Sequence, residues 1–240
     1  MTTTPFPLRH EDEATGLVAA VFADIRRRMA FTPAIFKALA ADPPALERAW
    51  VHARAIVDDP RFDASTSRLE AAARAPGRGS TRAISEAVAP FAAELPGMLL
   101  IVSSLGLALD GRVPLYPPPP LGVAAGAAPP EPTVPESRVE HPLYAEIRSL
   151  YGTAHVPSLY RSLAALDLLD EAWPVAADAL TSTDGQARVA RVAEAGEREA
   201  LAFDRVACFD AEGTRPVLDQ FRIALPRNLV AVFALRDGPA

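Results

Sequence analysis

The residues best placed to do chemistry lie at two similar helix starts. One runs from Phe31 to Lys37 and the other from His155 to Arg161, each with a proline at its third position. The first turn of a helix leaves backbone N–H groups unpaired, so such a start favours an anion. Lys37 and Arg161 occupy corresponding positions, and each has the charge to hold a carboxylate. We expect an anion site if the two starts face each other; the alternative is two exposed charges on core helices.

Other signatures of catalysis are sparse. The four histidines, at positions 10, 52, 141 and 155, show no metal-ligand spacing, so neither a metal nor a cofactor is expected. The single cysteine, Cys208, lies in an apolar run, and we interpret it as a buried thiol rather than a nucleophile. The sequence has no phosphate-binding glycine loop and no nucleophile elbow.

The two helix starts belong to a longer internal similarity. Residues 33–40 correspond to residues 157–164, and Trp50 and Trp173 follow with a slip of one residue. Such a duplication predicts two tandem helical repeats that form an intramolecular pseudo-dimer, with the seam as the first place to look for a site. Apolar residues recur at helical spacing and strand-like alternation is nearly absent, so we predict an all-α fold.

Composition sets the boundaries of the repeats. We assign residues 1–112 to the first helical repeat, 113–141 to a proline-rich linker and 142–240 to the second repeat. The linker could instead dock proline-recognising modules. Near the end of each repeat a proline, Pro96 or Pro226, is expected to start a new helix, because proline interrupts a helix interior.

Charge and hydropathy exclude several partners. A net charge of −6 argues against a nucleic-acid partner. The longest apolar stretch, residues 97–109, is too short for a membrane span and is better explained as a buried core helix. With one cysteine and no signal-peptide pattern, we expect a cytoplasmic protein. A homodimer remains an open alternative.

Two further segments point to a family. Residues 13–16 with 21–26, and the second block from Val156 to Ala164 with Trp173 beyond it, resemble the group I 2-haloacid dehalogenase family, also called the halocarboxylic acid dehydrogenase family. The resemblance implies an all-helical pseudo-dimer with its active site between the repeats. It also implies that an aspartate activates a water molecule, which displaces halide directly from C2 of a small 2-haloacid without a covalent enzyme ester.

The resemblance assigns roles to positions of this chain. It places the catalytic aspartate after Ser158 and before the pair Tyr160–Arg161, where this chain has Leu159. It places a water-binding asparagine near residues 95–98, where none occurs. The substrate-binding residues that we carry forward from the two repeats are Phe31, Lys37, Ser158, Leu159, Tyr160 and Arg161.

Three functions stay open from the sequence. The first is a hydrolase acting on a small carboxylic acid, with Asp42, His155 or Asp167 as a substitute base. The second is a non-catalytic protein that keeps the fold and a small-molecule pocket. The third is a helical interaction protein that uses the proline-rich linker.

Overall fold

The computed structural model describes residues 6–74, 80–113, 121–123, 134–203 and 211–236. Within these ranges the regular elements are all helical, which confirms the predicted all-α class. Cys208 and most of the proline-rich linker lie outside the described residues. The elements are η1 (Glu11–Glu13), α1 (Gly16–Arg26), α2 (Ala34–Leu39), α3 (Pro43–Val57), α4 (Phe62–Ala73), α5 (Arg82–Leu109), α6 (Tyr144–Tyr151), α7 (Ser158–Ala165), α8 (Leu169–Thr181), α9 (Thr183–Ala200) and α10 (Ala211–Arg236).

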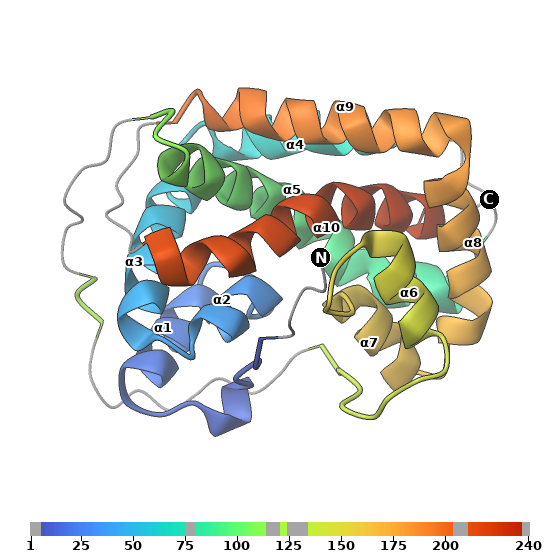
Figure 1. Ribbon diagram of the computed structural model, residues 1–240, viewed down its shortest axis with the longest axis horizontal. Coiled ribbons are helices and arrows are strands. Elements are labelled where there is room, and N and C mark those ends of the chain that lie inside the picture. The colour runs from blue at the N-terminus through green and yellow to red at the C-terminus, as the bar shows by residue number, and fades with distance from the viewer. Residues whose placement is uncertain (1–5, 75–79, 114–120, 124–133, 204–210, 237–240) are drawn as a thin grey trace.

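The helices are arranged around a central pair, α5 and α10. Figure 1 shows α1, α2 and α3 gathered at one end, α6, α7 and α8 at the other, and α4 beside α9 along one edge. Each central helix contacts both ends: α5 packs against α3 and α7, and α10 packs against α8 and α2. The two long helices therefore hold the starts of α2 and α7 in fixed positions between them.

The segments that are similar in sequence make corresponding contacts. Trp50 Nε1 donates a hydrogen bond of 2.7 Å to Asp24 Oδ2, and Trp173 Nε1 donates one of 2.9 Å to Glu146 Oε1. Trp50 also meets the ring of Phe36 edge-on, with 5.4 Å between ring centroids, as Trp173 meets Tyr160 at 5.3 Å. These matched contacts fix α2 onto α3 and α7 onto α8 in the same way.

The expected helix breaks at Pro96 and Pro226 are wrong. Pro96 lies inside α5 and Pro226 lies inside α10. At each place one long helix replaces the two shorter helices that were expected. An interior proline costs about 3 kcal/mol. Beyond it, however, residues 97–108 and 229–235 are all buried, and each large apolar side chain removed from water contributes about 1.5–3 kcal/mol. Burial of several such side chains offsets the proline.

Helix α5 is long and apolar enough to cross a membrane. Within the protein, 83% of its most apolar 18-residue window is buried. Its apolar character is therefore accounted for by its place between α10, α9, α4 and the helix starts.

Replacement of the two tryptophans tests the matched contacts. Asp24, the acceptor for Trp50, is buried, whereas Glu146, the acceptor for Trp173, is exposed. Loss of the Trp50 indole therefore leaves a buried carboxylate with one hydrogen bond fewer, while water can replace the Trp173 indole at Glu146. We expect Trp50→Phe to lower the free energy of unfolding by about 2–4 kcal/mol and Trp173→Phe by about 1–2 kcal/mol. Urea denaturation of both variants measures this; equal losses would contradict the assigned role of Asp24.

Candidate binding site

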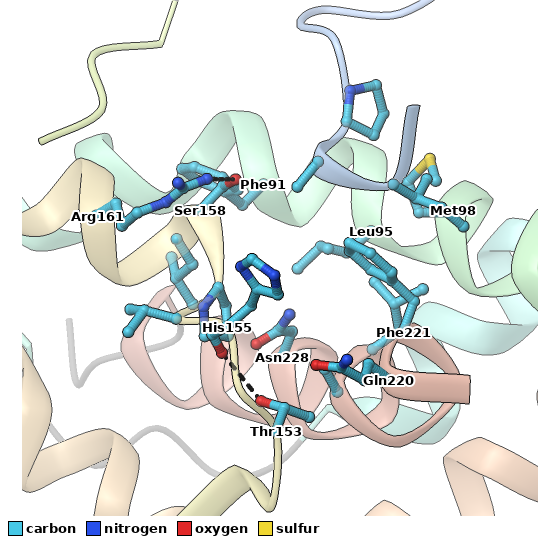
Figure 2. A pocket seen from close by; sticks show the side chains of 18 of the residues that line it. Phe91, Leu95, Met98, Thr153, His155, Ser158, Arg161, Gln220, Phe221 and Asn228 are labelled. Atoms are coloured by element: carbon cyan, nitrogen blue, oxygen red, sulfur yellow. Dashed lines mark hydrogen bonds between the residues drawn. The ribbon is translucent and has the colours of Figure 1, made fainter. Parts of the chain in front are cut away.

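A small cavity lies where α5, α10 and the two helix starts meet. Its volume is about 60 Å³, enough for a few water-sized groups. Figure 2 shows side chains from these elements converging on it. Phe6 and Leu8, from the N-terminal segment, cover one side. The other lining residues are Phe31, Pro33, Ala34, Ile35, Phe91, Leu95, Met98, Thr153, His155, Val156, Pro157, Ser158, Leu159, Arg161, Gln220, Phe221, Ala224, Leu225 and Asn228.

Both predicted helix starts face this cavity. Pro33 precedes α2 and Pro157 precedes α7, and neither has a side chain that can cap the first N–H groups. The first intrahelical bonds in α7 are made by the N–H groups of Tyr160 and Arg161 to the Pro157 carbonyl. The N–H groups of Ser158 and Leu159, which come before them, have no intrahelical partner, and both residues line the cavity. This juxtaposition gives the cavity a positive end.

The structure separates the predicted site residues into two sets. Phe31, Ser158, Leu159 and Arg161 line the cavity. Tyr160 does not, because its side chain is fully buried between other helices. Its hydroxyl shares a 2.8 Å hydrogen bond with that of Tyr151. Burial raises the pKa of Tyr160, so the phenol stays neutral in the core, away from the cavity.

Lys37 also lies away from the cavity, in a buried ion cluster. Lys37 Nζ is 3.0 Å from Glu11 Oε2 and 3.1 Å from Glu136 Oε1, and Arg161 Nη2 is 2.8 Å from Glu136 Oε2. The two cations that occupy corresponding positions thus share one carboxylate, that of Glu136, which precedes α6 in the chain. Neither is an exposed charge, and only Arg161 of the two lines the cavity. The sequence analysis did not identify Glu136.

Glu136 is ionised in this cluster. Burial opposes its ionisation, but Arg161 and Lys37 outweigh burial and hold the pKa of the Glu136 carboxyl below its ordinary value of 4.5. Arg161 is also held by a 3.0 Å hydrogen bond from Nη2 to Ser158 Oγ (Figure 2). Its Nε is buried and has no hydrogen-bond partner in the described part of the chain. Arg161 itself lines the cavity, so this unpaired nitrogen belongs to a residue of the cavity wall.

The cavity has an apolar side and a polar side. Where corresponding positions of the two similar segments line it, the second segment carries the polar residue. Phe31 corresponds to His155, Ala34 to Ser158, and Met98 to Asn228. Other corresponding pairs are apolar on both sides: Pro33 and Pro157, Ile35 and Leu159, Phe91 and Phe221, Leu95 and Leu225.

His155 is neutral and its ring is already engaged. Its Nε2 accepts a 2.9 Å hydrogen bond from the Phe6 N–H, and the Phe6 ring lies 3.8 Å from its own ring, centroid to centroid. Because Nε2 accepts, the proton of the neutral ring is on Nδ1. Burial, together with the charge of Arg161, lowers the pKa of His155 to about 4. The ring has no lone pair free for a water molecule.

The two other substitute bases considered from sequence are placed elsewhere. Asp42 caps α3 by accepting a 3.2 Å hydrogen bond from Ala45 N–H. Asp167 follows α7 with a positive φ of 56°. Neither lines the cavity, and none of its described lining residues is an aspartate or glutamate. Within the described ranges, no group of three His, Cys, Asp or Glu residues is arranged to hold a metal ion.

A second, larger cavity adjoins the first. It measures about 690 Å³ and is lined by polar residues of the linker end and of α6, including Arg138, Glu140 and Arg148. Leu8, His155, Val156 and Arg161 line both cavities, so these residues form the wall between them. The N-terminal segment thus contributes to both.

Comparison with solved structures identifies the fold. A D-2-haloacid dehalogenase mutant with D-2-CPA is 16% identical and superposes with a TM-score of 0.69 over 99% of this chain and 100% of that chain. Another D-2-haloacid dehalogenase mutant gives 14% identity and 0.71, over 98% and 99%. The D-2-haloacid dehalogenase with L-LA gives 15% and 0.68, also over 98% and 99%. No protein-family model and no curated protein matches. The chain has the fold of the D-2-haloacid dehalogenases.

Removal of the shared carboxylate tests the ion cluster. Glu136→Gln leaves two buried cations with less compensating charge, so we expect it to cost about 3 kcal/mol of unfolding free energy at pH 7. Because the pKa of Glu136 is lowered on folding, its stabilising effect is present above pH 4.5 and is lost as the pH falls through the folded-state pKa. The wild type should therefore lose more stability on acidification than Glu136→Gln does.

Chemical denaturation from pH 3 to 7 measures both effects. The matched control is Glu140→Gln, because Glu140 is exposed and pairs with Arg148 at the surface. It should cost less than about 1 kcal/mol. Equal losses of unfolding free energy in the two variants would show that the buried cluster stabilises the fold no more than a surface ion pair does.

The protonation state of His155 can be measured directly. We expect an NMR titration to give a midpoint near pH 4 for His155 and the Nδ1–H tautomer at pH 7. The unfolded chain binds a proton at His155 near pH 6.5 and the folded chain does not, so this residue lowers stability as the pH falls from 6.5 toward 4. A midpoint near 6.5 would contradict the buried, Phe6-bound ring.

Proposed function

We propose that this chain binds a small carboxylic acid in the cavity between α2, α5, α7 and α10, and does not hydrolyse haloacids by the direct attack of water. Leu159 carries the proposal. It lines the cavity at the position to which the sequence resemblance assigns the catalytic aspartate. An alkyl side chain cannot take a proton from water, and a missing general base typically costs about 10²–10⁴ in rate.

The carboxylate is assigned to the α7 end of the cavity. Three donors gather there: the unpaired first-turn N–H groups of α7, the Ser158 hydroxyl and the buried Arg161 Nε. A helix start favours an anion through its N–H groups and its dipole. The remaining ligand atoms lie against the apolar side formed by Phe31, Phe91 and neighbouring residues.

A hydrolase that uses His155 is the second candidate. His155 lines the cavity and is neutral at pH 7, as a general base must be. Its Nε2, however, is bound to the Phe6 N–H. Catalysis through this ring requires the N-terminal segment to leave, which makes binding the better-supported function.

The proposal includes the internal duplication. The matched tryptophan contacts, the matched prolines inside α5 and α10, and the paired lining residues support two repeats, 1–112 and 142–240, joined by a linker. The site then lies at their seam, and the cytoplasm remains the expected compartment. The non-catalytic interaction function through the linker has no comparable support.

Binding and halide release, measured on the same samples, test this function. We expect calorimetry to show binding of D- or L-2-chloropropionate with a Kd of about 0.1–1 mM, in keeping with so small a ligand. Chloride release should be absent. Release by the wild type that disappears in His155→Asn would establish the hydrolase instead, and absence of binding by any small acid would refute the proposal.

Leu159→Asp and Leu159→Asn form a matched pair in the same assay. The two side chains have nearly the same shape, but only the aspartate can accept a proton from water. If the cavity is otherwise competent, Leu159→Asp should release chloride about 10²-fold faster than Leu159→Asn. Equal rates would mean that Leu159 does not stand at the reacting centre.

A further inference from the structure

Asn228 is a buried polar residue in the wall of the cavity. Its residue is 7% exposed, it lines the cavity from α10, and its Oδ1 has no hydrogen-bond partner in the described chain. Buried polar side chains are nearly always bonded, because an unpaired one loses its hydration without compensation. An exception that faces a cavity calls for a partner inside the cavity.

The neighbouring polar side chains have partners within the protein. Gln220 Oε1 accepts a 3.2 Å hydrogen bond from Ala154 N–H, and Thr153 Oγ1 donates one of 2.9 Å to the His155 carbonyl. His155 Nε2 is bound to Phe6 N–H. Asn228 is therefore distinct from the other polar groups beside it on this part of the wall.

The unpaired groups lie at different ends of the cavity. Figure 2 shows Asn228 projecting from α10 on one side of His155, while Ser158 and Arg161 lie on the other side at α7. Arg161 Nε is an unpaired donor and Asn228 Oδ1 an unpaired acceptor. A ligand that satisfies both presents an acceptor at one end and a donor at the other.

We propose that Asn228 recognises a hydroxyl group at the end of the ligand remote from its carboxylate, so that the natural ligand is a small hydroxy acid whose hydroxyl lies beyond C2. This inference rests on the proposed function, since the carboxylate fixes the orientation. It assigns Asn228 as a specificity-determining residue. The corresponding residue of the first repeat, Met98, has no polar group for this role.

A hydroxyl fits the site better than the alternatives. A hydroxyl can donate to Oδ1 or accept from the amide N–H₂, so it is matched whichever way the Asn228 amide is turned. An ammonium would be placed in a cavity that has Arg161 in its wall and no acidic lining residue among those described. A halogen or a methyl group at that end has no polar hydrogen to donate, so it leaves Oδ1 unpaired.

Pairs of acids that differ only in hydroxyl against methyl test this recognition on the wild-type protein. The probes are 3-hydroxypropionate against butyrate, and 4-hydroxybutyrate against pentanoate, with affinities measured by calorimetry. We expect the hydroxy acid of at least one pair to bind about tenfold more tightly, the discrimination typical of one satisfied buried hydrogen bond. Binding of all four acids without a preference would overturn the inference but leave the proposed function standing.

Two variants locate the preference. Asn228→Met installs the residue of the corresponding first-repeat position, and the hydroxyl preference should disappear while the alkyl acids bind at least as well. Thr214→Val is the matched control, because Thr214 Oγ1 is also buried and unpaired on α10 but does not line the cavity. Its preference should equal that of the wild type.

A preference that survives in Asn228→Met would show that another group recognises the hydroxyl. If none of the acids binds the wild type, both proposals fail.

Discussion

The packing of α5 against α10 is the constraint on which the rest of the structure depends. Residues 97–108 of α5 and 229–235 of α10 are buried without a break, so each helix has a segment that must be covered on every side. Because α5 contacts α7 and α10 contacts α2, neither end can shift without uncovering a central helix. The cavity is the space left between these two helices and the two helix starts, which proline leaves without side-chain caps.

This arrangement also explains the buried charge at the seam. The helices α2 and α7 bring Lys37 and Arg161 to one place, and two buried cations side by side repel each other unless a carboxylate lies between them. Glu136, with Glu11, meets that requirement. The chain around Glu136 is thereby bound to both α2 and α7. Arg161 pairs with Glu136 and also lines the cavity, so the ion cluster holds a charged residue of the cavity wall in place.

Most of the fold could be predicted from local patterns. Apolar residues at helical spacing indicate the helices, and the similar blocks around Trp50 and Trp173 indicate the two helix starts that meet at the cavity. Proline gave the main error, because the rule against it inside helices is local, whereas the burial that outweighs it in α5 and α10 is tertiary. The site was predicted in part. Charge and position suggested Lys37, but which carboxylate neutralises it depends on contacts about a hundred residues apart in sequence.

The same limit explains why Asn228 was missed. A single asparagine in a helix has no local pattern, and it becomes informative only when its oxygen is found buried and unpaired in a residue that lines a cavity. Leu159 and Asn228 then belong to one physical argument. In the proposed function, Leu159 offers no base at the α7 start, and Asn228 offers a hydrogen-bonding group from α10. Neither residue alters the α7 helix start, which gives the cavity its positive end. Under the two proposals the cavity lacks a group that could activate water and has one that distinguishes a hydroxyl from a methyl group, as expected of a binding site.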